Sequence, residues 1–140
     1  MTLDRFIRRY VSCYPISLLL EQRCGPRFLS RRFHNHLIAA EDTRRTGRLL
    51  SSIAVNGTLI AYHEHNERQQ TPALIARLEK GDSLALVSDA GMPTISDPGL
   101  RLVRAALAED LPVVTVPGPN AAVAALSIAG LATDRFVFEG

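Results

Sequence analysis

Residues 83–94 read SLALVSDAGMPT, an apolar run followed by a polar loop. The same pattern recurs along the rest of the sequence. The apolar run over 84–87 is short, and it gives way abruptly to small and polar residues from Ser88 onward. Continuous apolar runs of this length are typical of strands that are covered on both faces of a parallel sheet. We therefore predict a buried strand over 83–87 that ends in a ligand-accessible loop.

The same alternation of apolar runs and helical patterns continues in both directions from this strand. Further strands are predicted over 36–40, 58–62, 112–116 and 136–138, and helices over 43–54, 69–80, 97–109 and 120–129. Parallel neighbours need a crossover connection, which is nearly always a right-handed helix. The order of elements predicts an α/β fold with a mostly parallel sheet and helices on both faces.

Several residues mark the ends and the buried sides of these helices. Gly81 stands where a C-terminal cap belongs, and Asp97 followed by Pro98 predicts an N-cap with proline at the first helical position. The expected buried residues are Leu49, Leu50 and Ile53 in the first helix, Leu74, Ile75 and Leu78 in the second, and Leu100, Val103 and Leu107 in the third.

Length and composition exclude several classes of protein. The chain has 140 residues, of which 46% are hydrophobic and 21% charged, which is ordinary for one globular domain. No apolar run approaches the roughly 18 residues that cross a bilayer, and the N-terminus lacks a secretory pattern. Cys13 and Cys24 could pair, but a domain with a good core does not need a disulfide, and two thiols make no metal framework. We therefore expect a soluble, reduced, cytoplasmic protein.

The formal net charge of +2 is unevenly divided along the chain. Residues 1–36 hold seven arginines and two acidic residues, so this segment carries +5 and residues 37–140 carry −3. An arginine-rich segment could bind a nucleic-acid backbone. It has no clear helical or strand period, however, and the alternative that it is an atypical segment without that role stays open.

Polar clusters follow four of the predicted strands. They are Glu41-Asp42, residues 63–67, residues 88–94 and residues 117–120. Ligands of parallel α/β sheets bind beyond the carboxyl ends of the strands. We therefore expect these four loops to converge on one ligand-binding edge.

The chemistry of these loops narrows the ligand. Small residues around Asp89 let a ligand approach the backbone, and its carboxylate suits a hydroxyl or a cationic group better than a phosphate. Neither a Walker pattern nor GxGxxG is present, which disfavours nucleotide hydrolysis and common dinucleotide binding. His63 and His65 lack a third ligand for zinc, so a role in base catalysis or substrate binding is favoured over a metal site.

Two assignments remain open from the residues alone. Glu41 and Asp42 could serve as a base, as partners of an arginine, or as a solvated helix N-terminus. Asn120 could cap the helix that follows it or contact a ligand.

Five ordered stretches resemble a known family. They are LIAAEDTRRTGRLL (37–50), YHEHNE (62–67), ALVSDAGMPTISDPG (85–99), VPGPNAAVAALSIAGL (116–131) and DRFVFEG (134–140). Together they closely resemble the bacterial 16S rRNA cytidine 2'-O-methyltransferases of the tetrapyrrole methylase-like superfamily. The resemblance covers residues 37–140, in order and with plausible spacing.

The resemblance implies transfer of a methyl group from S-adenosylmethionine to the ribose of a decoding-site cytidine, with 16S rRNA or the small ribosomal subunit as partner. By similarity, the cofactor would contact Asp89, Ala90, Gly91, Met92, Asn120 and Ala121. The catalytic candidates are Glu41, Asp42, His63, His65 and Glu67, and the substrate-binding candidates are Thr43, Arg44 and Asn66. The resemblance does not single out the base, and it implies no metal.

The sequence departs from the family at both ends. Residues 10–19 keep Tyr10, Val11, Pro15 and Ile16 of an expected first strand and loop but lack its Gly-Asn pair. Residues 18–36 match nothing expected of the first helix, and a frameshift or an incorrectly assigned start could produce such a stretch. Family members continue past Gly140 into a second α/β domain, with the cofactor held between the two. We thus expect an altered segment over 1–36, an N-terminal methyltransferase domain over 37–140 and no C-terminal domain, so that this chain alone binds S-adenosylmethionine weakly. The competing hypothesis is a non-catalytic α/β module that dimerises or binds RNA or a nucleoside.

Overall fold

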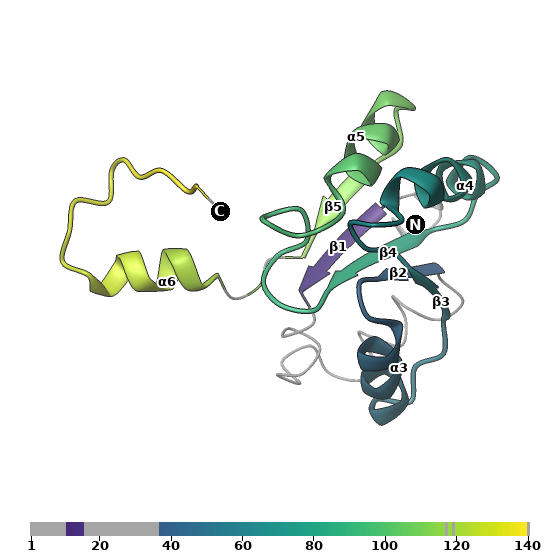
Figure 1. Ribbon diagram of the computed structural model, residues 1–140, viewed down its shortest axis with the longest axis horizontal. Helices are drawn as coiled ribbons and strands as arrows, with labels where there is room; N and C mark the ends of the chain where they lie inside the picture. The colour runs from purple at the N-terminus through teal and green to yellow at the C-terminus, as the bar shows by residue number, and fades with distance from the viewer. Residues whose placement is uncertain (1–10, 16–36, 117, 119, 140) are drawn as a thin grey trace, which may run out of the picture.

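The computed structural model describes residues 11–15, 37–116, 118 and 120–139, and shows a parallel sheet flanked by helices (Figure 1). The strands are β1 (Val11–Pro15), β2 (Leu37–Ala40), β3 (Thr58–Ala61), β4 (Leu84–Ser88) and β5 (Val113–Thr115). They form one sheet in the order β3-β2-β4-β1-β5, and every neighbouring pair is parallel. The predicted α/β class is confirmed.

The two adjacent strands β2 and β4 are buried along their whole length. Their register pairs Leu37 with Leu84 and Ala40 with Val87, so the two strands end at the same level of the sheet. Glu41, directly after β2, and Asp89, directly after β4, therefore begin neighbouring loops at one edge.

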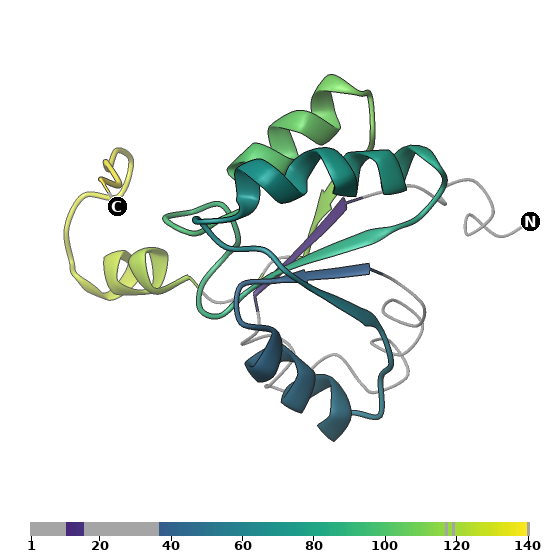
Figure 2. The same ribbon diagram turned by 45° about the vertical axis from the view of Figure 1, so that its right-hand side comes forward.

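Helices cover both faces of this sheet (Figure 2). α4 (Glu67–Glu79) and α5 (Leu100–Ala108) lie side by side on one face, and α3 (Thr43–Ser52) lies on the other. Because strand side chains alternate between faces, Leu84 and Leu86 of β4 join the core under α4 and α5, whereas Ala85 and Val87 pack with α3. The predicted buried residues of α3 and α4 are confirmed, with Ile53 and Ile75 only partly buried.

The predicted start and buried side of α5 are wrong. The N-cap is Gly99 rather than Asp97, and the buried residues are Leu102 and Ala106. Leu100 and Leu107 are 47% and 57% exposed, and of the predicted stripe only Val103 packs partly against the core. Gly99 has a φ of 126°, so the chain turns there and the helix starts later and in a different phase.

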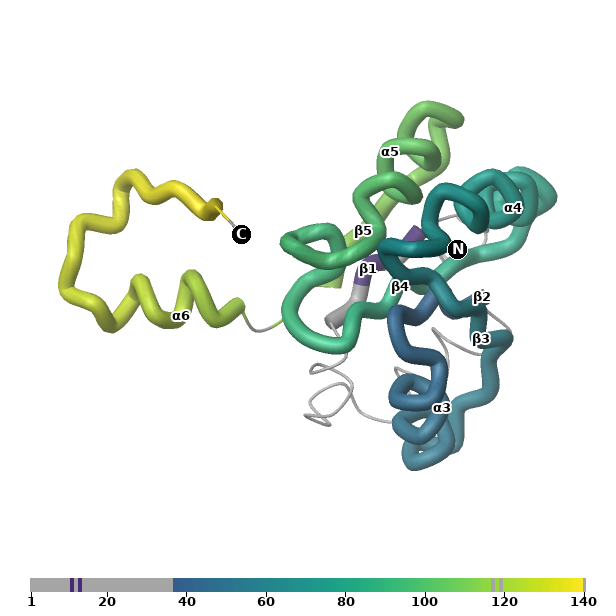
Figure 3. The backbone as a smooth tube through the Cα atoms, viewed as in Figure 1, coloured from purple at the N-terminus to yellow at the C-terminus, as the bar shows by residue number. Residues whose placement is uncertain are grey.

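The chain leaves the sheet after β5. α6 (Ala121–Ile128) forms where a helix was predicted, but residues 120–139 lie apart from the rest of the described fold (Figure 3), and nearly all of their side chains are exposed. The strand predicted over 136–138 is wrong: this segment has no strand partner among the described residues, and Phe136 and Phe138 are more than half exposed. None of the described helices has the length and apolar character needed to cross a membrane.

β1 occupies the sheet position between β4 and β5. It falls in the segment where an altered first strand was expected, and Val11 is fully buried. Cys13 is a buried free thiol, and burial raises its pKa to about 11. Cys24 and the remaining residues of 16–36 lie outside the described residues.

Candidate functional site

The loops that follow β2 and β4 meet at the carboxyl edge of the sheet. Glu41 Oε2 accepts a hydrogen bond from the backbone N–H of Asp89, at 3.2 Å and across 48 residues of sequence. The level ends of the two strands place these residues together, so the predicted convergence is confirmed for this pair of loops.

Asp97 joins these two residues to form what we call the acidic group, Glu41, Asp89 and Asp97. Burial raises the pKa of Asp89, and the charge of Glu41 raises it further. The pKa of Asp97 is raised by burial and then by the charges of Glu41 and Asp89. The charge of Glu41 thus disfavours ionisation of both aspartates, and a bound cation would relieve that repulsion.

Asp89 has one oxygen without a partner. Its Oδ1 is buried and has no hydrogen bond of normal geometry with the described residues, although the backbone N–H of Asp42 acts on the carboxylate and lowers its pKa. Its Oδ2 lies 3.8 Å from Arg45 Nη1. A buried acceptor left unsatisfied is costly and marks a place where a ligand donor or cation fits. This atom is the clearest sign of a ligand at the edge.

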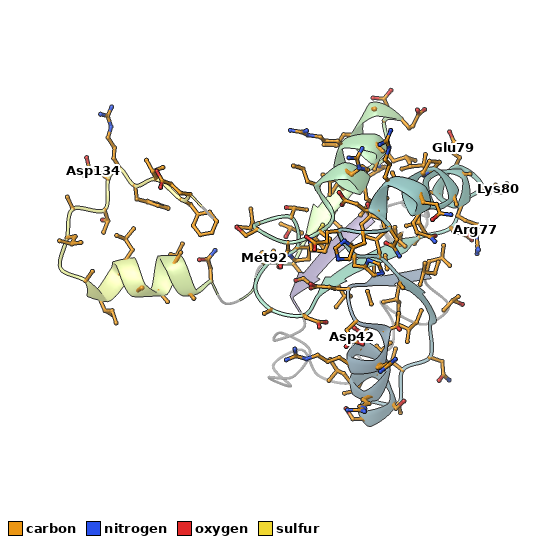
Figure 4. The ribbon with its side chains drawn as sticks, in the orientation of Figure 1. Asp42, Arg77, Glu79, Lys80, Met92 and Asp134 are labelled. Atoms are coloured by element: carbon orange, nitrogen blue, oxygen red, sulfur yellow. The ribbon has the colours of Figure 1, made fainter. Side chains whose placement is uncertain are left out.

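The loop after β4 folds back on itself beside the acidic group. Ser88 Oγ donates to the carbonyl oxygen of Gly91 at 3.1 Å, and Gly91 has a φ of 68°. Ala90 and Gly91 are exposed, and Met92 is half-buried. Figure 4 shows Met92 at this edge, whereas Arg77, Glu79 and Lys80 lie at the opposite end of the body. The loop leaves its backbone open to a ligand.

Glu67 connects the start of α4 to the start of α5. Its Oε2 accepts from the backbone N–H of Gly99 at 3.4 Å, and its Oε1 lies 3.6 Å from Arg101 Nε. Both carboxylate oxygens therefore contact groups within the fold. The contacts assign Glu67 to holding the far end of the 88–99 loop, and its proposed catalytic role stays a prediction.

We expect Glu67→Ala to lower the free energy of unfolding by about 1 kcal/mol, because the buried N–H of Gly99 loses its acceptor. Glu67→Gln keeps an acceptor and loses only the half-exposed pair with Arg101, so its loss should stay below about 0.5 kcal/mol. Urea unfolding measures both losses, and Glu64→Ala, at an exposed residue just before α4, is the control. Equal losses for the alanine and glutamine variants would contradict this assignment.

Asn66 organises the loop that follows β3. Its Oδ1 accepts from the backbone N–H of His63 at 2.9 Å, and its Nδ2 donates to the carbonyl of Ala61 at 2.9 Å. The amide thus fixes the backbone that carries His63. His63 Nδ1 is buried and has no hydrogen-bond partner among the described residues.

The second histidine of this loop is solvent-exposed. His65 Nε2 lies 3.3 Å from Glu64 Oε1, and its ring stands 5.9 Å from that of His63, centre to centre. Across the residues that the structure describes, no three histidine, cysteine or acidic side chains gather as metal ligands do.

Asp42 and Asn120 both act as helix caps. Asp42 Oδ1 accepts from the backbone N–H groups of Arg44 and Arg45, at 2.8 and 3.2 Å, and these bonds lower its pKa. Thr43 is the first residue of α3, and Arg44 is exposed on it. Asn120 Oδ1 accepts from the N–H of Val123 at 3.0 Å. For both residues the helix-terminus alternative describes the observed contacts.

The structure does not bring Asn120 and Ala121 to the acidic group. Both are exposed, and α6 lies apart from the sheet (Figure 1). Asp97 is the reverse case, because its sequence position suggested only a helix cap. Asp97 lies at the end of the same small-residue loop that carries Asp89. That position could have identified it as a member of the acidic group.

Fold and site together define an α/β domain that carries an acidic ligand site at the carboxyl edge of a parallel sheet. Residues 28–138 match the model of the tetrapyrrole (corrin/porphyrin) methylases, and the chain belongs to this family.

Named relatives point to one branch of that family. Ribosomal RNA small subunit methyltransferase I of Escherichia coli O157:H7 is 55% identical over 104 residues, which make up 74% of this chain and 36% of the relative. The proteins of the same name from Synechocystis and Halalkalibacterium halodurans are 54% and 52% identical, again over 74% of this chain and over 37% and 36% of their own lengths. The chain therefore spans little more than a third of these relatives.

Proposed function

We propose that this chain forms the N-terminal part of an S-adenosylmethionine-dependent methyltransferase that modifies the ribose 2'-oxygen of a cytidine in 16S rRNA. The single observation that carries the proposal is the acidic group with its unpartnered Asp89 oxygen, set in a fold whose relatives are named as small-subunit rRNA methyltransferases. The decoding-site cytidine and the small ribosomal subunit as partner follow from the family resemblance.

The residues at the edge fit this cofactor chemically. S-adenosylmethionine, when bound, supplies an electrophilic methyl group on a positively charged sulfonium, and it also carries an ammonium group. Asp89 offers a buried acceptor to such a cation, and Ala90, Gly91 and Met92 present open backbone. The raised pKa values of Asp89 and Asp97, to which the charge of Glu41 contributes, favour a cationic ligand there over a phosphate.

His63 and Glu41 are the candidates for taking the proton of the ribose hydroxyl. Asp42 and Glu67 are occupied as a helix cap and as the partner of Gly99, and His65 lies in solvent. Glu41 already accepts from Asp89, whereas His63 Nδ1 has no partner among the described residues. We favour His63, because an imidazole nitrogen without a hydrogen-bond partner is suited to general base chemistry.

A chimera tests the function, since this chain spans only part of its relatives. Residues 37–140 would replace the matching segment of the Escherichia coli relative, and methyl transfer from labelled S-adenosylmethionine to small ribosomal subunits would be measured. We expect transfer within about tenfold of the parent relative, a change of about 1.4 kcal/mol. The labelled nucleotide should resist alkaline cleavage, as a 2'-O-methyl ribose does. A folded chimera that transfers no methyl group, or that methylates only a base, would contradict the proposal.

A further inference from the structure

We propose that Arg44, Arg45 and Arg48 of α3 form a basic face that binds the phosphate backbone of RNA. The proposal rests on the proposed function and adds a second binding surface. The acidic group would bind the cofactor, and the arginines of α3 would bind the RNA substrate.

The three arginines project away from the core. Arg44 and Arg48 are one helical turn apart, at i and i+4, and Arg45 lies on the flank beside them. All three are exposed, while the opposite side of α3 is buried through Thr46, Leu49 and Leu50. Positive side chains one turn apart repel each other, so folding gains nothing from placing them together.

Arg44 and Arg48 also lack the ion pairs that Arg77 and Arg101 form. Arg77 pairs with Asp82, and Arg101 lies 3.6 Å from Glu67 Oε1. In the described part of the chain, no carboxylate lies within ion-pair distance of Arg44 or Arg48, and Arg45 has only the 3.8 Å contact with Asp89. The nearest acid in sequence, Asp42, is occupied as the cap of the same helix.

The position of α3 connects the basic face to the site. The helix begins two residues after Glu41, so its first turn lies at the carboxyl edge, and the contact between Arg45 and Asp89 spans from helix to loop. An RNA strand held along α3 would therefore reach the acidic group with its ribose. A phosphate bound by Arg45 would also free Asp89 Oδ2.

The composition of α3 favours RNA over an acidic protein as the partner. Protein interfaces have an apolar core surrounded by polar residues, but the leucines of α3 are turned into the fold. Binding of a phosphate backbone requires only accessible cationic groups, and each contact releases counterions. The basic face offers charge without apolar surface.

Fluorescence anisotropy of a labelled single-stranded RNA, without cofactor, tests this proposal on the 140-residue chain. We expect the double variant R44A/R48A to bind about tenfold more weakly than the wild type. The slope of log K against log salt should become shallower by about 1.4, since each lost phosphate contact on a single strand removes roughly 0.7. Circular dichroism would verify that α3 remains folded, and alanine is a good helix former at both positions.

The matched control is K80A/R104A, which also removes two exposed cations, from the end of α4 and from α5 on the other face of the sheet. Equal weakening by both double variants, an unchanged salt slope, or displacement of RNA from the wild type by polyglutamate at equal charge concentration would overturn the proposal. Because no cofactor is present, RNA binding through α3 can hold even where the methyl-transfer proposal fails, and the reverse is also true.

Discussion

Gly99→Ala should destabilise the fold by about 3 kcal/mol. A Cβ atom at this position would lie 2.5 Å from Leu86 Cδ2 and 3.3 Å from Thr94 Cγ2, and Leu86 is 2% exposed in the core under α4 and α5. Overpacking of a buried position costs roughly 1–3 kcal/mol. The φ of 126° adds backbone strain on the order of 1–2 kcal/mol for a residue with a side chain.

Gly81→Ala separates the cost of overpacking from the cost of backbone strain. Gly81 has a similar φ of 106°, but nothing lies within 4 Å of the point that a Cβ atom would occupy there. This variant should therefore lose only the strain, about 1 kcal/mol, in urea unfolding followed by circular dichroism. If the two variants were equally stable, the close packing of Gly99 on β4 would be refuted.

Asp89→Asn should raise the KM for S-adenosylmethionine about 100-fold in the active chimera. The substitution keeps the shape of the side chain and removes the charge that we assign to the cationic cofactor. Loss of one partner from a desolvated charge pair typically costs about 2–5 kcal/mol, and about 2.7 kcal/mol corresponds to 100-fold. Because this interaction serves binding, KM should change more than kcat.

The same variant should not lose stability at neutral pH. Burial and Glu41 raise the pKa of Asp89 in the folded state, so the folded protein disfavours the charged form that exists at pH 7. Asparagine carries no charge and avoids this penalty. The stability advantage of the variant should shrink as the pH falls through the raised pKa, because the wild-type carboxyl then becomes neutral.

Asp82→Asn is the matched control, since Asp82 pairs with Arg77 at the opposite end of the body. It should leave the KM for the cofactor unchanged. A KM for the Asp89 variant within about threefold of the parent chimera, with the fold intact, would remove Asp89 from the cofactor site.

Much of the fold could be predicted from the sequence because each buried strand is short and strongly apolar. Residues 37–40 and 84–88 are covered on both faces, so their composition alone identifies them. The parallel order then follows from the helices between the strands, and it places Glu41 beside Asp89. The local sequence pattern and the chain topology were therefore sufficient to predict that Glu41 and Asp89 lie close together.

The remaining features depend on contacts between distant residues. The start of α5 is set by the left-handed turn at Gly99 and by its bond to Glu67, 32 residues earlier, so the Asp97-Pro98 signal placed it too early. The apolar sequence of α5 fits more than one helical phase, and the small Ala106 takes the buried position that Leu107 was expected to hold. Asp97 was missed as a member of the acidic group because Glu41, the charge that raises its pKa most, comes from the loop after a different strand.

The central claim is that the carboxyl edge of the sheet binds S-adenosylmethionine, and a nuclear magnetic resonance titration of the isotope-labelled chain tests it most directly. The method detects weak binding, and the ligand can be raised to about 1 mM, where a free energy of about −4 kcal/mol suffices. We predict that the largest amide shifts fall on Glu41, on Asp89 to Met92 and on Gly99, with Gly57 and Gly81 at the opposite edge unchanged. Largest shifts at Gly57 and Gly81, or no shifts at any concentration, would contradict the account.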